Sequence, residues 1–184
     1  HICKTFSGAG KSVESAAKRH KCTVAEIYKR KLFAYFMLFL YDTGMRPKEL
    51  RYLRVNEVTP NKSPASLEKG LDGSDAKNTV IVNVRAENSK TGYGRAIPVV
   101  LKASYNEIIK TQNALGCDLQ PNDYLFMNVN SEQRLPYTRE ALSNRLRTAL
   151  VDSGLQSELD AENKNITLYS ARHAFITWKM RYGQ

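Results

Sequence analysis

The sequence contains few residues of the kinds that build metal sites and disulfide frameworks. Among its 184 residues there are three cysteines and three histidines. Cys3, Cys22 and Cys117 are odd in number and widely spaced, so they match neither a disulfide framework nor a zinc-binding pattern. No cluster of carboxylates suggests a magnesium site. We therefore expect a protein of a reducing compartment whose chemistry uses no metal ion.

A long hydrophobic run is also missing. The apolar-rich stretch at residues 32–41 (LFAYFMLFLY) is about half the length that a membrane-spanning helix needs. No signal peptide is recognisable at the start of the chain, which begins with His1. The hydrophobic content of 42% and the charged content of 25% are typical of a soluble globular domain. We therefore expect a domain with its own hydrophobic core.

Acidic residues are few relative to basic ones. The 28 Lys and Arg residues outnumber the 18 Asp and Glu residues, which gives a formal net charge of +10 and a pI near 9.6. Such a balance suggests a polyanionic partner, of which nucleic acid is the commonest. A basic surface that binds no partner is the alternative.

A glycine and a proline separate two predicted helices in the sequence YDTGMRPKEL at 41–50. Gly44 can adopt the left-handed conformation that closes a helix, and Pro47 suits the first turn of the next helix. Arg46 is thereby held at a helix N-terminus, where backbone N–H groups favour an anion. Glu49 follows three residues later and can orient the guanidinium of Arg46.

Hydrophobic periodicity and turn residues predict a mainly helical α+β domain with a small antiparallel sheet. The sheet contains a hairpin whose first strand reads TVIVNV, whose turn covers about 88–94 and whose second strand runs from Arg95 to Val100. A third strand is left open. We expect residues 1–22 to form a linker or flexible arm and residues 23–184 to form the domain. The predicted helices are one from the capping residue Thr23 to about Thr43, two at about 47–54 and 102–115, one capped by Thr138 and a last one capped by Ser170. The helix after Thr138 carries an apolar stripe of Leu142, Leu146, Ala149 and Leu150. Loops are predicted at 59–78 and 152–165.

Three cationic side chains lie where the backbone would hold them firmly. Arg46 begins a helix, Lys90 lies in the hairpin turn SKTGYGR, and Arg172 lies in the first turn of the last helix, in LYSARHAF. Two guanidiniums that converge on one phosphate can bind its oxygens in fork geometry and stabilise a five-coordinate transition state. A lysine on a hairpin could donate a proton to a departing 5′ oxygen. Singly, each residue has an ordinary explanation as an ion-paired or solvated side chain, so the hypothesis depends on their combination.

The segments TGMRPKEL, SKTGYGRAIP, DYLF and LYSARHAF, in that order, closely resemble the catalytic domain of the tyrosine recombinases, the phage integrase family. The resemblance covers about residues 23–184 and implies a fold like that of DNA breaking–rejoining enzymes. It implies that Arg46 and Arg172 are the two catalytic arginines, that Glu49 supports Arg46, and that Lys90 is the general acid. Members of the family cut a DNA strand with a tyrosine, form a 3′-phosphotyrosine and rejoin the strand to a 5′-hydroxyl, without a cofactor.

The resemblance also implies partners and a location. It implies double-stranded DNA as the substrate, a tetramer on DNA for the full-length protein, and a phage or other mobile element as the source. The expected location is the cytoplasm, either generally in a bacterial host cell or associated with its nucleoid. The basic side chains that we expect to contact the DNA backbone include Arg95, Arg139 and Arg145, with a steep dependence of binding on salt.

Two side chains beside the second arginine depart from, or add to, the family pattern. Tyr169 stands three residues before Arg172, where the family usually has histidine. A phenol can still donate a hydrogen bond to a phosphate oxygen, but its pKa of about 10 makes it a poor base at neutral pH. We expect Tyr169 and His173 to support the phosphate site, with a hydrogen-bonded core position as the favoured role of His173.

The nucleophilic tyrosine of the family lies well beyond the second arginine, and we expect no equivalent among residues 1–184. Tyr182 lies only ten residues after Arg172, and we expect it to be a packing residue rather than a nucleophile. Trp178 lies six residues after Arg172, and we expect it in the core. We therefore expect a catalytic domain that lacks its C-terminal segment and that is inactive in cleavage by itself. The alternatives are a non-catalytic DNA-binding relative that acts as a regulator and, less favoured, a topoisomerase that uses related chemistry.

Overall fold

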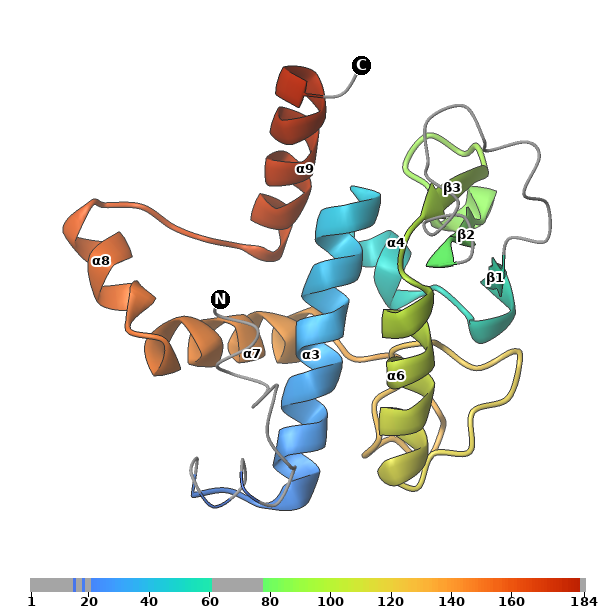
Figure 1. Ribbon diagram of the computed structural model, residues 1–184, viewed down its shortest axis with the longest axis horizontal. Coiled ribbons are helices and arrows are strands. Elements are labelled where there is room, and N and C mark those ends of the chain that lie inside the picture. Colours follow the sequence, from blue (N-terminus) through green and yellow to red (C-terminus); the bar gives the residue numbers. More distant parts are fainter. Residues whose placement is uncertain (1–14, 16–17, 19–20, 61–77, 183–184) are drawn as a thin grey trace.

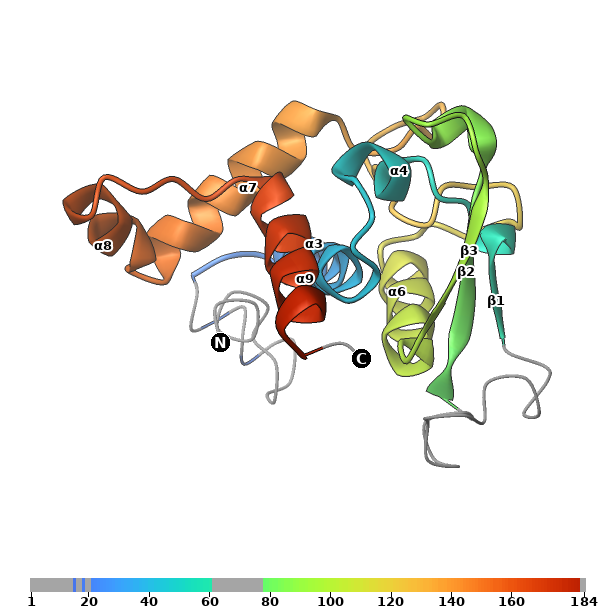
Figure 2. The same cartoon turned by 90° about the horizontal axis from the view of Figure 1, so that it is seen from above.

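The computed structural model describes residues 15, 18, 21–60 and 78–182. Within this part of the chain it confirms a mainly helical domain with a small antiparallel sheet, and the open third strand is present. Most of the linker predicted at 1–22 and most of the loop predicted at 59–78 lie outside the described residues. The sheet and helix α6 (Lys102–Ala114) lie on one side of the central helix α3 (Val24–Thr43), and α7 (Arg139–Asp152) and α8 (Leu155–Ala161) lie on the other (Figures 1 and 2).

Helix α3 begins and ends as the sequence predicts. The Thr23 side chain caps its N-terminus by accepting a 3.1 Å hydrogen bond from the backbone N–H of Glu26. Gly44 closes it in the left-handed conformation, with φ of +60°, and donates its N–H to the carbonyl of Leu40. Buried Phe36 and Phe39 pack edge-on against Phe126, with ring centroids 5.1 Å and 5.9 Å away, which places α3 in the hydrophobic core.

Helix α4 (Pro47–Arg51) is shorter than the predicted 47–54. After it, Leu53 accepts a hydrogen bond from the N–H of Leu125 at 2.8 Å, and Arg54 forms an isolated bridge with Tyr124. Arg54 has the extended conformation of a bridge residue, with φ of −96° and ψ of 160°, so residues 53–54 pair with a distant segment of the chain instead of continuing α4.

The sheet contains three antiparallel strands in the order β1 (Val58–Pro60), β2 (Val80–Val84) and β3 (Arg95–Val99). Short 3₁₀ helices precede β1 (Val55–Glu57) and follow β2 (Ala86–Asn88). Val80, Val82 and Val84 are buried and alternate with more exposed residues, which matches the predicted period of two. Val82 pairs with both Val58 and Ile97, so β2 is the central strand.

Helices α6 and α7 agree with the predictions. Helix α6 ends close to the predicted position, just before Gly116. The Thr138 side chain caps α7 by accepting from the N–H of Ala141 at 3.1 Å. The predicted apolar stripe is buried, and it comprises Leu142, Leu146, Ala149 and Leu150.

The predicted loop at 152–165 is wrong, because it contains helix α8. Gly154 adopts φ of +76° and precedes the first helical residue, Leu155. Leu159, one turn later, is buried in the core beside partly buried Leu155. This pair forms a short apolar face that the acidic composition of the segment obscures.

The start of the last helix, α9 (Leu168–Tyr182), also differs from the prediction. The Ser170 hydroxyl accepts a hydrogen bond from the N–H of Thr167 at 3.0 Å, so Ser170 lies inside the first turn rather than before it. Arg172 therefore lies beyond the first turn of α9, not within it. Helix α9 packs against α3 (Figures 1 and 2), and its first half brings Arg172 and Phe175 to the loop around Gly44.

Candidate active site

A buried carboxylate joins two arginines from different elements. Glu49 on α4 has a side chain that is 0% exposed. Its Oε2 accepts the backbone N–H of Arg46 at 2.7 Å, and its Oε1 accepts Nη1 of the same arginine at 3.1 Å. Arg95, the first residue of β3, donates Nη1 to Oε1 at 3.2 Å and Nη2 to Oε2 at 2.7 Å. Four donors therefore occupy one carboxylate, which is close to its full capacity.

These contacts determine the ionisation of Glu49. Burial by itself would raise the pKa of this carboxyl group, but the hydrogen bonds and positive charges of Arg95 and Arg46 outweigh burial and lower the pKa below its ordinary value. Glu49 is therefore ionised at neutral pH. Sequence reasoning found its partner Arg46, three residues away, but not Arg95, which is 46 residues away in the chain.

Arg172 reaches the same place from α9. Its Nη1 donates a hydrogen bond to the backbone carbonyl of Gly44, in the loop just before Arg46. Burial lowers the pKa of Arg172, and the positive charges of Arg46 and Arg95 lower it further, whereas Glu49 acts in the opposite direction. The guanidiniums of Arg46 and Arg95 are therefore close enough to repel that of Arg172. Such a cluster favours binding of an anion, because an anion relieves the repulsion.

Gly44 is the point where α9 contacts the loop between α3 and α4. The ring of Phe175 on α9 packs against Gly44 so closely that a methyl group there would overlap it. Phe175 follows Arg172 by three residues and therefore lies on the same side of the helix. The left-handed conformation and the close approach both require glycine, and together they place Arg172 beside Arg46.

Lys90 lies in the turn between β2 and β3, and not on the loop or the helix that carry Arg46 and Arg172. It is exposed there, and neighbouring Ser89 and Thr91 share a 3.0 Å hydrogen bond. The structure thus places Arg172 at the carbonyl of Gly44, two residues before Arg46, and places Lys90 in the exposed turn of the hairpin.

The side chains around Arg172 on α9 are more exposed than expected. Tyr169, one turn before Arg172, is 44% exposed, and its hydroxyl influences the pKa of Arg172. His173 is exposed, so the core position favoured for it is wrong. His173 follows Arg172 directly in the sequence, but its side chain faces solvent.

The core position predicted for Trp178 is also wrong, and Tyr182, predicted as a packing residue, is exposed. Their side chains are 47% and 70% exposed. The Trp178 ring lies 6.4 Å from that of Tyr182 and 5.2 Å from Nζ of Lys179.

The two predicted DNA-contacting arginines of α7 differ in their surroundings. Arg139, the first residue of the helix, is exposed. The Nη1 atom of Arg145 lies 3.0 Å from Oε1 of Glu26 on α3, so its charge is already paired. Arg51, which the sequence analysis did not select, donates Nε to the carbonyl of Tyr137 at 2.7 Å and so ties α4 to the start of α7.

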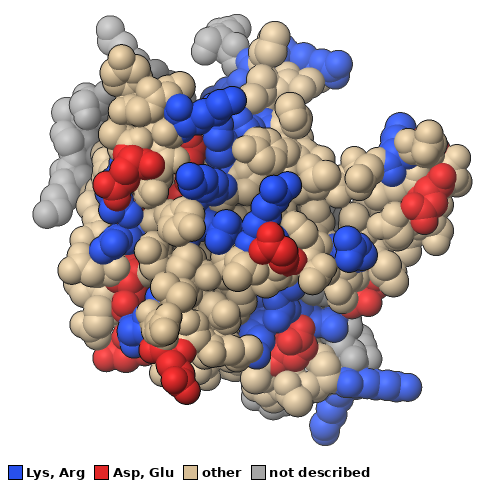
Figure 3. Space-filling view, turned by 180° about the vertical axis from the view of Figure 1, so that it is seen from behind, with Lys and Arg blue, Asp and Glu red and all other residues tan. Residues whose placement is uncertain are grey.

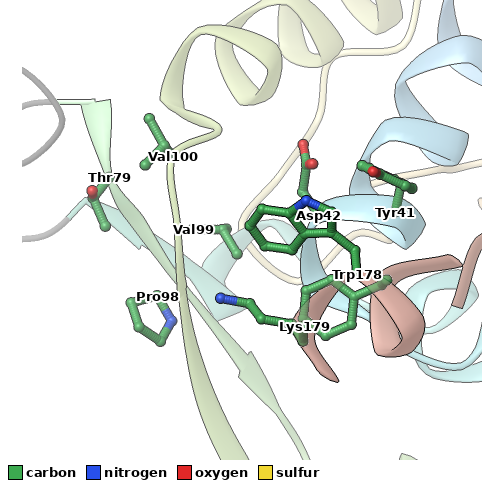
Figure 4. Close-up of a pocket in the computed structure, with 9 residues that line it drawn as sticks. Tyr41, Asp42, Thr79, Pro98, Val99, Val100, Trp178 and Lys179 are labelled. Atoms are coloured by element: carbon green, nitrogen blue, oxygen red, sulfur yellow. The ribbon is translucent and has the colours of Figure 1, made fainter. Parts of the chain in front are cut away.

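Basic side chains gather on one face of the molecule. Viewed from behind, Lys and Arg side chains form a group across the upper middle of the surface, with few carboxylates among them (Figure 3). A separate groove of about 580 Å³ lies between the end of α3, β3 and α9, with Asp42, Val99 and Trp178 in its lining (Figure 4). Its lining is mainly apolar, and the arginine cluster lies outside it.

Neither a metal-binding cluster nor a membrane-spanning helix is found in the part of the chain that the structure describes. In the described ranges, no three or more His, Cys, Asp and Glu side chains lie close enough to bind a metal ion together. The same ranges include no helix with the length and apolar character needed to cross a membrane.

Comparison with known proteins gives one family and one fold. The model of the phage integrase family matches residues 12–183. The chain is similar to the site-specific recombinase XerH in its post-cleavage complex with a palindromic difH substrate, with a TM-score of 0.58 and 15% identity over 98% of this chain and 40% of that one. The pre-cleavage complex gives a TM-score of 0.56 and 15% identity over 98% and 41%. The chain thus spans about two-fifths of the XerH chain. No curated protein sequence matches it.

Proposed function

Because the chain belongs to the phage integrase family, we propose that it is the catalytic domain of a site-specific DNA recombinase that cuts and rejoins double-stranded DNA through a 3′-phosphotyrosine. The observation that carries this proposal is the cluster of Arg46 and Arg172 beside the buried carboxylate of Glu49. The cluster has more positive than negative charge, and a DNA phosphodiester is an anion of the right kind to bind there.

In the proposed reaction Arg46 and Arg172 bind the two non-bridging oxygens of the scissile phosphate. A tyrosine oxygen attacks phosphorus, and the bond from phosphorus to the 5′ oxygen breaks. The guanidiniums stabilise the charge that develops on the five-coordinate phosphorus. Lys90 donates a proton to the departing 5′ oxygen, and its exposed position leaves its ammonium group accessible to DNA. Tyr169 donates a hydrogen bond to a phosphate oxygen.

Tyr182 is a poor candidate for the attacking tyrosine. Ten residues of α-helix separate it from Arg172, which corresponds to about 15 Å along the axis of α9. A nucleophile must lie about 3 Å from phosphorus while Arg172 contacts an oxygen of the same phosphate. The prediction that residues 1–184 do not include the nucleophile therefore stays in place, and so does the prediction that this chain by itself does not cleave DNA.

The proposal extends to the assembly and its location. The XerH structures are complexes of a recombinase with difH DNA, which supports duplex DNA as the partner of this chain. We propose that the full-length protein acts as a tetramer on DNA in the cytoplasm of a bacterial host, with Arg139 at the DNA backbone.

The test is covalent trapping on nicked duplexes that carry the junction sequences of the mobile element. The protein is expressed from its natural reading frame, with Arg46→Ala and Lys110→Ala variants alongside, and adducts are resolved on denaturing gels. We expect an adduct for the wild type and Lys110→Ala, and a loss of at least a hundredfold for Arg46→Ala. Duplex binding without an adduct in any of these proteins would instead support the non-catalytic DNA-binding relative, which Tyr169 at the usual histidine position favours.

A further inference from the structure

The sequence analysis predicts that Arg95 contacts the DNA backbone, but in the structure its guanidinium pairs with Glu49. Both of its terminal nitrogens donate to Glu49, at 3.2 Å and 2.7 Å, in the parallel fork geometry of a bidentate pair. The Glu49 side chain is fully buried and that of Arg95 is 35% exposed. Arg95 therefore lies between the carboxylate and the surface, with its donors directed inward.

The Arg95–Glu49 pair reduces the number of hydrogen bonds that Arg46 must donate to Glu49. Arg46 uses its backbone N–H and one terminal nitrogen, Nη1, to contact Glu49. No hydrogen bond from its Nε or Nη2 is found among the described residues, and its side chain is 24% exposed. Because Arg95 provides the fork that a buried carboxylate requires, Arg46 keeps two donor groups for another ligand.

We propose that Arg95 is a positioning residue: it neutralises and orients Glu49 so that Arg46 can direct its remaining donors at a phosphate. The role rests on the proposed function, because the phosphate is that of the bound DNA. Without Arg95, Glu49 is a buried charge with one cationic partner, and it draws the guanidinium of Arg46 into a bidentate pair of its own. Arg46 then has fewer donors for DNA.

A lysine at position 95 separates this role from a direct contact with DNA. Lysine carries a point charge that serves a phosphate well, but it cannot make two parallel N–H bonds to one carboxylate. A positioning role therefore predicts that Arg95→Lys fails as Arg95→Ala does. A phosphate contact predicts that Arg95→Lys behaves like the wild type.

The experiment measures binding of a fluorescent duplex DNA to the chain by anisotropy at one fixed salt concentration. The proteins are the wild type, Arg95→Ala, Arg95→Lys, Arg46→Ala and the double variant Arg46→Ala/Arg95→Ala, with Lys110→Ala as a control on the exposed side of α6. We expect about tenfold weaker binding for Arg95→Ala and for Arg95→Lys. We expect the double variant to bind within twofold of Arg46→Ala, because Arg95 acts through Arg46. Wild-type affinity for Arg95→Lys, or additive losses in the double variant, would overturn the assignment.

A second measurement does not depend on DNA. Titration of the Glu49 side chain by carbon-13 NMR should give a pKa below the ordinary carboxyl value in the wild type and a clearly higher pKa in Arg95→Lys. If the wild type fails to bind duplex DNA, the proposed function fails, and this titration still decides the role of Arg95. Equal Glu49 pKa values in the two proteins would reject it. Circular dichroism establishes that each variant is folded. If Arg95→Ala does not fold, Arg95→Lys still tests the proposal.

Discussion

At the scale of single residues, Glu49 shows how burial and charge together define the site. A carboxylate removed from water costs several kcal/mol unless hydrogen bonds and opposite charges replace its hydration. Here four donors from two arginines do so, and they keep the pKa below the ordinary value despite burial. The charge of Glu49 is therefore a structural requirement of the arginine cluster as well as a support for Arg46.

The first prediction concerns acid stability. Because the folded-state pKa of Glu49 is lower than its unfolded value, the ionised group stabilises the fold above an ordinary carboxyl pKa of 4.5. That contribution is lost as the pH falls from 4.5 through the lowered folded pKa. We expect Glu49→Gln to reduce the free energy of unfolding at pH 7 by about 3 kcal/mol, and the difference from wild type to shrink in acid. Urea unfolding at a series of pH values measures both. A difference that stays constant with pH would contradict the ionised state of Glu49.

The second prediction concerns Gly44. A methyl group there meets the Phe175 ring, and a side chain is also unfavourable at φ of +60°. We expect Gly44→Ala to lower the free energy of unfolding by about 3 kcal/mol, as the sum of overpacking and backbone strain. Gly92→Ala is the matched control, because Gly92 has φ of +74° with open space around it and should lose only about 1 kcal/mol. Equal losses in the two variants, measured by thermal or urea unfolding, would mean that Phe175 does not press on Gly44.

At the scale of elements, two differences from prediction arise from contacts with distant parts of the chain. Helix α4 stops early because Arg54 is extended and pairs with Tyr124, a contact that no local sequence pattern predicts. Helix α8 forms in an acidic segment because Leu159 reaches the core. In both places the burial of a few apolar or backbone groups outweighs intrinsic propensity, which is a weak influence over so few residues.

The third prediction tests helix α8. If Leu159 packs in the core, Leu159→Ala should cost about 2–3 kcal/mol of unfolding free energy, in the range of other buried leucines. Ser157→Ala, on the exposed side of the same helix, should change stability by less than about 0.5 kcal/mol. Chemical denaturation measures both variants. A neutral Leu159→Ala variant would indicate that residues 155–161 form a loop on the surface.

At the scale of the whole molecule, the net charge of +10 and the gathered Lys and Arg side chains of one face predict binding to duplex DNA with a strong salt dependence. Not every basic residue contributes equally. Arg145 is paired with Glu26, and Arg95 is paired with Glu49, whereas Arg139 is exposed at the N-terminus of α7. Net charge therefore indicates the class of partner, and the ion pairs decide which side chains are available to it.

The fourth prediction follows from that difference. If Arg139 contacts one phosphate, Arg139→Ala should reduce the magnitude of the slope of log affinity against log salt by about 0.9. The reason is that one phosphate contact fewer releases fewer counterions from the DNA. Lys110→Ala, on the exposed side of α6, should leave the slope unchanged. Anisotropy titrations of a labelled duplex at four or more salt concentrations give the slopes. An unchanged slope for Arg139→Ala would remove this residue from the DNA interface.

The sequence by itself determined the features that depend on neighbouring residues. Thr23, Thr138 and Gly44 mark helix ends through caps and backbone conformation, alternating valines mark the central strand, and Arg46 with Glu49 forms a pair within one helical turn. Only the tertiary structure decided that Arg95 donates two hydrogen bonds to Glu49 and that Arg172 binds the carbonyl of Gly44, 128 residues away. A guanidinium can reach any carboxylate or carbonyl that packing places beside it, and that choice depends on how the helices and the hairpin pack against one another rather than on any spacing in the chain.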